Sequence, residues 1–78
     1  MNVVYVMNDC KYCKLAKELM QRANLEYEEV LLDRDMTRQE VKETLQMEVV
    51  TFPQVVYNGK HLGGLIDTAK HFQSIGLV

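Results

Sequence analysis

The segment VVYVMNDCKYC, residues 3–13, decides the fold of this chain. It opens with Val3-Val4-Tyr5-Val6, an apolar, β-prone run that is typical of a strand buried on both faces. The run ends at Asn8-Asp9, and Cys10-Lys11-Tyr12-Cys13 follows directly. Apolar residues then recur at three- and four-residue spacing and predict a helix with one buried face: Leu15, Ala16, Leu19, Met20 and Ala23. The cysteine pair therefore lies where a strand ends and a helix begins.

The remaining sequence continues this alternation of strands and helices. It predicts, in chain order, a strand at residues 27–32, a helix from the capping box Thr37-Arg38-Gln39-Glu40 to about Gln46, strands at 54–57 and 60–62, and a helix near 66–74. Asn58-Gly59 is a strong hairpin signal, because both turn positions need positive φ. The order β-α-β-α-β-β-α indicates an α/β fold whose first two strands are parallel and whose last two are antiparallel.

Length and composition limit the class of protein. The chain has 78 residues, of which 47% are apolar, and this suits one globular domain over residues 1–78. Its net charge of −2 does not favour nucleic acid or an anionic membrane as a partner. No apolar run approaches the roughly 18 residues of a membrane span, and the first residues lack the pattern of a signal peptide. We expect a cytoplasmic protein that acts as a monomer.

The two cysteines indicate chemistry rather than a structural bridge. A disulfide that encloses only two residues constrains the unfolded chain very little, so it would be a poor structural staple. Half of a zinc site is the main alternative, but zinc needs two further ligands, and only His61 and His71 are available, ten residues apart. We therefore predict a reducing compartment, a redox-active pair and no bound metal.

The position of the pair predicts a role for each cysteine. The first N–H groups of a helix are unpaired and carry partial positive charge, so they stabilise a thiolate and lower a cysteine pKa to roughly 3.5–7.5. Lys11 and Lys14 add positive charge nearby. Cys10, at the helix start, is expected to attack a substrate disulfide, and Cys13, inside the first turn, is expected to resolve the mixed disulfide.

Four features occur in order along the chain: Cys10-x-Tyr12-Cys13 after the first strand, Thr51-Phe52-Pro53 before the third, Gly63-Gly64 after the hairpin, and Asp67 at the start of the last helix. With them the chain resembles a dithiol glutaredoxin over nearly its whole length. The resemblance implies a thioredoxin fold, with a four-stranded mixed sheet flanked by three helices. It also implies a thiol–disulfide oxidoreductase with glutathione as reductant, acting on protein disulfides or glutathione mixed disulfides, with ribonucleotide reductase as one candidate client.

The resemblance further implies a glutathione site. The peptide bond before Pro53 would be cis, and the backbone of Phe52 would pair with the tripeptide like an added strand. Gly64 would allow close approach of the backbone, and Asp67 would meet the γ-glutamyl end. The implied binding residues are Tyr12, Thr51, Phe52, Pro53, Gly64 and Asp67.

Among the positions that depart from the usual pattern of the family, two are uncharged where a basic residue is common. Met7 stands where a lysine is common, and Val50 stands where an arginine is common. Both basic groups would hold the carboxylates of glutathione, so Lys11, Lys14 or Lys42 is a candidate to replace them. The departures favour an alternative in which thioredoxin reductase supplies the electrons. A further alternative is an iron–sulfur carrier that ligates a cluster, shared by two chains, through its first cysteine and glutathione.

Overall fold

The apolar run at residues 3–6 forms an inner strand of a four-stranded sheet in the computed structural model of the chain, which describes residues 1–78. This strand, β1 (Val3–Val6), pairs in parallel with β2 (Glu28–Leu31) and antiparallel with β3 (Gln54–Tyr57). β3 in turn pairs antiparallel with β4 (Lys60–Gly63), so the strand order is β2-β1-β3-β4. All four residues of β1 are buried, as the sequence predicts.

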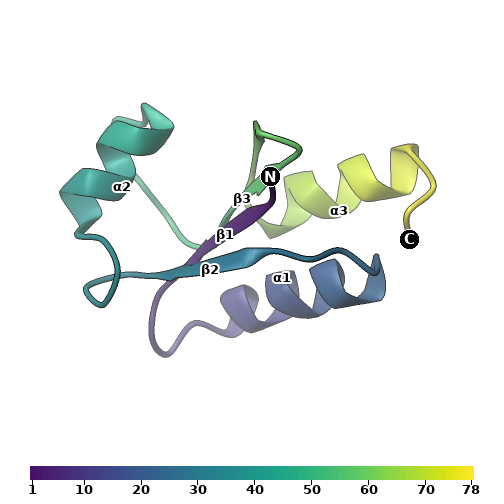
Figure 1. Ribbon diagram of the computed structural model, residues 1–78, viewed down its shortest axis with the longest axis horizontal. Helices are drawn as coiled ribbons and strands as arrows, with labels where there is room; N and C mark the ends of the chain where they lie inside the picture. The colour runs from purple at the N-terminus through teal and green to yellow at the C-terminus, as the bar shows by residue number, and fades with distance from the viewer.

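Three helices complete the fold (Figure 1). They are α1 (Lys11–Arg22), α2 (Arg38–Leu45) and α3 (Leu65–Ser74). The element order and the mixed sheet confirm the predicted thioredoxin fold. None of the helices is both long enough and apolar enough to cross a bilayer.

The sheet carries a separate apolar core on each face, because successive side chains of a strand point to opposite faces. The larger core joins the sheet to α1 and α3: Val4, Val6, Cys13, Ala16, Met20, Ala23, Val55 and Phe72. The smaller core lies between the sheet and α2: Val3, Tyr5, Val41 and Val50. Figure 1 shows α2 standing apart from the other two helices. The cysteine helix and the helix that carries Arg38 therefore pack on opposite faces of one sheet.

Two local signals in the sequence are confirmed. The capping box is complete, because the Glu40 N–H donates to Thr37 Oγ1 at 3.1 Å and the Thr37 N–H donates to Glu40 Oε1 at 2.9 Å. This pair of bonds makes Arg38 the first residue of α2. The hairpin turn between β3 and β4 has Asn58 at φ 50° and Gly59 at φ 78°, as its Asn-Gly sequence requires.

Some boundaries and exposures differ from the sequence-based expectations. Leu15 is 38% exposed, because the buried face of α1 follows Ala16, and Leu15 lies about 100° around the helix from it. β4 continues through Gly63, so the chain leaves the hairpin at Gly64. α3 consequently begins at Leu65, one residue earlier than predicted. β2 is one residue shorter at each end than its apolar pattern suggests.

Candidate functional site

Cys10 and Cys13 form a disulfide at the start of α1. Cys10 is the N-cap residue in an extended conformation, and its Sγ accepts a hydrogen bond from the Cys13 N–H at 3.1 Å. Their Cα atoms lie 5.2 Å apart. Cys13 is 2% exposed and belongs to the larger core, whereas Cys10 is only partly buried. The outer sulfur is thus the more accessible one and the inner sulfur is held in the protein, and the roles of the two cysteines stay a prediction.

The disulfide lies beside a partly open hollow that both acidic and basic side chains line, among them Asp9 and Glu29. Lys11 and Lys14 are exposed, and neither ammonium group forms an ion pair. Lys14 lines this hollow together with Met7 and both cysteines. A thiolate formed at Cys10 on reduction would face the positive end of α1 and these two charges, and all of them favour the anion.

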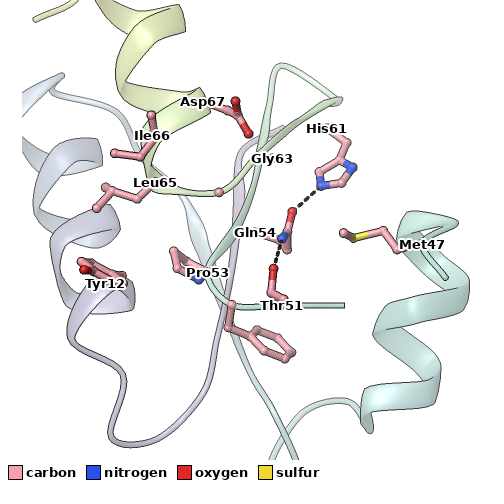
Figure 2. Close-up of a pocket in the computed structure, with 12 residues that line it drawn as sticks. Tyr12, Met47, Thr51, Pro53, Gln54, His61, Gly63, Leu65, Ile66 and Asp67 are labelled. Carbon is pink, nitrogen blue, oxygen red and sulfur yellow. Dashed lines mark hydrogen bonds between the residues drawn. The ribbon is translucent and has the colours of Figure 1, made fainter. Parts of the chain in front are cut away.

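A groove of about 580 Å³ lies beside Pro53 (Figure 2). All six residues that the resemblance assigns to glutathione line it: Tyr12, Thr51, Phe52, Pro53, Gly64 and Asp67. They come from α1, from the loop before β3 and from the start of α3, and the fold brings them together. Neither cysteine lines the groove itself, but Tyr12, which stands between them in the sequence, does. Their role in binding glutathione stays a prediction.

The loop before β3 and the start of α3 form two walls of this groove. The Phe52–Pro53 peptide bond is cis, as expected. Gly64 is the N-cap residue of α3, and a Cβ atom there would meet the Pro53 carbonyl oxygen at 3.6 Å. This distance is an ordinary van der Waals contact, so the backbone of Gly64 lies directly against that of Pro53 without excluding a small side chain.

Asp67 is the third residue of α3 rather than its N-cap. Its carboxylate is exposed and forms no hydrogen bond or ion pair within the chain, so it is available to a ligand. Gly63 makes room for it: φ at Gly63 is 116°, and a Cβ there would lie 2.6 Å from Asp67 Oδ2. A residue with a side chain at position 63 would therefore displace the Asp67 carboxylate.

Gly63, which the resemblance implies allows close approach of the backbone, also lines the groove, and so do five residues that the sequence did not assign: Met47, Gln54, His61, Leu65 and Ile66. Among them, His61 Nε2 lies 2.7 Å from Gln54 Oε1, and Gln54 Nε2 donates to Thr51 Oγ1 at 3.2 Å (Figure 2). The sequence contains a signal that could have paired His61 with Gln54. The Asn-Gly turn sets the register near the turn, so that His61 lies opposite Val56. Gln54 lies two residues before Val56 in the same strand, so it points to the same face as His61.

Arg38 is the most informative residue that the sequence analysis missed. Its guanidinium carbon lies 5.5 Å from the centre of the Phe52 ring, and its Nη1 donates to the Val50 carbonyl oxygen at 3.2 Å. Val50 itself is 5% exposed and belongs to the core beneath α2. A basic side chain is therefore missing at position 50 but present beside Phe52, supplied by a different element. Lys42 lines the same hollow as Arg38 and Val50.

Comparisons with known proteins agree with this geometry. The glutaredoxin family model matches residues 2–62. The chain is 35% identical over 69 residues to the hybrid peroxiredoxin hyPrx5 of Haemophilus influenzae, a match that covers 88% of this chain and 28% of that protein. It is 35% identical over 74 residues to a glutaredoxin of Ricinus communis, covering 91% of this chain and 72% of the relative. Among solved structures, a buckwheat glutaredoxin–glutathione complex superposes with a TM-score of 0.78 at 24% identity, covering 97% of this chain and 71% of that one.

Proposed function

Because this chain belongs to the glutaredoxin family, whose members are thiol–disulfide oxidoreductases, we propose that it is a dithiol glutaredoxin that uses glutathione to reduce disulfides. The observation that carries the proposal is the Cys10–Cys13 disulfide at the start of α1, beside a groove that gathers all six expected ligand residues. A structural neighbour in complex with glutathione supports the choice of reductant. The substrates are disulfides in proteins or mixed disulfides with glutathione.

The two cysteines divide the reaction into balanced exchange steps. In the reduced protein, the Cys10 thiolate attacks one sulfur of the substrate disulfide and displaces the other as a thiolate. Cys13 loses its proton and attacks Cys10 Sγ, which forms the Cys10–Cys13 disulfide and releases the second substrate sulfur. The substrate gains two electrons and two protons, one proton from Cys13 and the other from solvent. One glutathione thiolate then attacks Cys10 Sγ and displaces Cys13, and a second attacks the bound glutathionyl sulfur, which releases oxidised glutathione.

The charges around the groove suit glutathione, which carries an ammonium group at its γ-glutamyl end and a carboxylate at its glycyl end. We assign the ammonium to the Asp67 carboxylate at the start of α3. The glycyl carboxylate goes to Arg38, whose guanidinium lies over Phe52. Figure 2 shows Asp67 and Thr51 at different ends of the groove, and an extended peptide would run between them. Arg38 lies outside the lining of the groove, beyond Phe52. Arg38 thereby supplies the positive charge for the carboxylate that the uncharged side chains of Met7 and Val50 lack.

A coupled assay tests the proposal. The protein is mixed with glutathione, glutathione reductase and NADPH, and the loss of NADPH is followed after a disulfide substrate is added. We expect turnover that requires Cys10, so that Cys10→Ser serves as the inactive control. No turnover at millimolar glutathione would reject glutathione as the reductant.

Reduction by thioredoxin reductase is the second candidate, and the uncharged residues at Met7 and Val50 favour it. The same assay with thioredoxin reductase in place of glutathione and glutathione reductase separates the two. An iron–sulfur carrier is less well supported, because the chain keeps Cys13 and a carrier needs only the first cysteine. A colourless protein after anaerobic cluster reconstitution would exclude it.

Two client classes follow from the family and from the relatives. Ribonucleotide reductase is one, because the family resemblance implies it. A peroxiredoxin is the other, because one relative is a hybrid peroxiredoxin. We propose that the chain acts on such clients as a cytoplasmic monomer. The rate at which each oxidised client draws electrons from NADPH through this protein ranks the two, and a rate equal to that of Cys10→Ser excludes a client.

A further inference from the structure

Three polar side chains form a hydrogen-bonded relay from the groove wall to the loop before Pro53. His61 Nε2 lies 2.7 Å from Gln54 Oε1, and Gln54 Nε2 donates to Thr51 Oγ1 at 3.2 Å (Figure 2). Gln54 is 3% exposed, so its amide relies on these two partners rather than on bulk water. All three side chains line the groove.

Each hydrogen bond of this relay can run in either of two directions, and the direction determines whether the Thr51 hydroxyl can donate its proton to a ligand. The carbonyl oxygen of an amide only accepts, so His61 Nε2 must carry a proton in the arrangement seen. Thr51 Oγ1 then accepts from Gln54, and its own proton remains free to donate into the groove. If the Gln54 amide turned over, Thr51 would donate to Oε1, and the amide nitrogen would donate to an unprotonated His61 Nε2. The hydroxyl would then have no proton left for a ligand.

Protonation of His61 selects between these two directions. An imidazolium carries protons on both ring nitrogens, so it permits only the direction seen, whereas a neutral imidazole permits both. We propose that His61 is a pH-sensitive positioning residue that sets, through Gln54, whether the Thr51 hydroxyl donates a hydrogen bond to a carboxylate or peptide carbonyl of a bound thiol peptide. That the ligand is a thiol peptide rests on the proposed function, whereas the hydrogen bonds of the relay are independent of it.

The charges that face His61 come from several elements. Asp67 of α3 and Tyr12 of α1 share the groove with it, and Tyr5 of β1 shares the hollow on its other side. Met1, which carries the N-terminal ammonium, lines the same hollow as Tyr5, and Lys60 precedes His61 in β4. The side chains of α2 and of the segment after it that line the groove or this hollow carry no charge. The imidazolium also adds positive charge to the groove wall, which attracts an anionic ligand. Both effects strengthen binding as the pH falls.

Equilibrium binding of a ligand that cannot react tests the inference. S-methylglutathione, whose thiol is blocked, is titrated into the oxidised protein by calorimetry between about pH 5.5 and about pH 8.5, where imidazoles change charge. We expect Kd to be larger at the upper end by up to about 10-fold, because the loss of one hydrogen bond sets the upper limit and a neutral His61 still permits both directions. In His61→Gln this dependence should vanish. His71→Gln is the matched control, because His71 packs against Tyr57 and Phe72, away from the groove.

Further variants and a ligand-free measurement distinguish positioning from a merely structural role. Thr51→Ser keeps the hydroxyl and should keep the full pH dependence, whereas Thr51→Val should keep only the smaller part that comes from the imidazolium charge. Nitrogen-15 NMR of the free protein should show the Gln54 side-chain amide shifting together with the His61 ring as the pH changes. If His61→Gln binds with an unchanged pH dependence, or the amide does not shift, the inference is wrong. If S-methylglutathione binds at no pH while the amide still shifts, the proposed reductant is wrong and the relay stands.

Discussion

Replacing Arg38 with glutamine should weaken glutathione binding far more than it weakens the fold. The guanidinium makes two contacts within the chain, the hydrogen bond to the Val50 carbonyl oxygen and the stacking over Phe52. A hydrogen bond contributes about 1 kcal/mol, and an exposed cation–π contact contributes about 0.5–1 kcal/mol. Arg38→Gln should therefore lower the free energy of unfolding by about 1–2 kcal/mol. A domain of ordinary stability, about 5–15 kcal/mol, remains folded after such a loss.

The effect on binding should be larger, because a hydrogen bond between a guanidinium and a carboxylate is charge-assisted. Such a bond contributes about 1.5–3 kcal/mol, which corresponds to about a 10- to 100-fold increase in Kd when it is lost. Lys42→Gln is the matched control, because it removes the same charge one turn further along α2 and from the same hollow. We expect Lys42→Gln to raise Kd by less than about 3-fold, because Lys42 makes no contact with Phe52 and would act on the ligand only as a charge that salt screens.

Two measurements separate the two effects. Calorimetry with S-methylglutathione gives Kd for the wild type and both variants, and urea unfolding followed by circular dichroism gives their stability. Arg38→Lys adds a graded case, because it keeps the charge but loses the planar fork that binds a carboxylate through two bonds. The reasoning is refuted if Arg38→Gln binds as tightly as the wild type. It is also refuted if the Arg38 and Lys42 variants weaken binding equally, because only the overall charge would then matter.

Three further predictions concern the cysteine pair and α2. Lys11→Glu should raise the pKa of the Cys10 thiol and slow its alkylation at neutral pH, and an unchanged rate–pH profile would count against any influence of this charge. Cys13→Ser should stop at the mixed disulfide, so intact mass should show one glutathione on Cys10; a protein that stays unmodified would contradict the assigned order of attack. The hydrogen bond from the Thr37 backbone N–H lowers the pKa of Glu40, so the Glu40 carboxylate stabilises α2 above its unfolded-state pKa and loses this effect as the pH falls. Glu40→Gln should therefore flatten the loss of stability between about pH 5 and about pH 3, and equal slopes for both proteins would exclude this role.

The parts of the site that depend on local sequence were predictable. The position of Cys10 follows from a strand that ends and a helix that begins, and Cys10 is indeed the N-cap residue of α1. The capping box predicted the start of α2 with Thr37 as its cap. The cis bond before Pro53 followed from the resemblance and not from physics, because about 5–6% of such bonds in folded proteins are cis.

The parts that depend on tertiary packing were not predicted. The capping box placed Arg38 at the first turn of α2, but it gave no information about which loop that turn would contact. The contact with Phe52 exists because Val41 and Val50 pack into the core beneath α2 and hold the helix against the loop. The pairing of His61 with Gln54 depends on strand register, which the hairpin turn specifies but which composition alone does not reveal.

Because α1 and α2 pack on opposite faces of the sheet, residues of one helix can be substituted with little effect on the other. The sulfur chemistry belongs to β1 and α1, whereas the cation assigned to the ligand lies on α2, in a different core. Substitutions on α2 can therefore change which thiol peptide or client is preferred without changing the environment of the sulfur atoms. The sheet thus separates the proposed cation from the sulfur atoms, while Tyr12 of α1 and Phe52, which packs against both cores, connect the two.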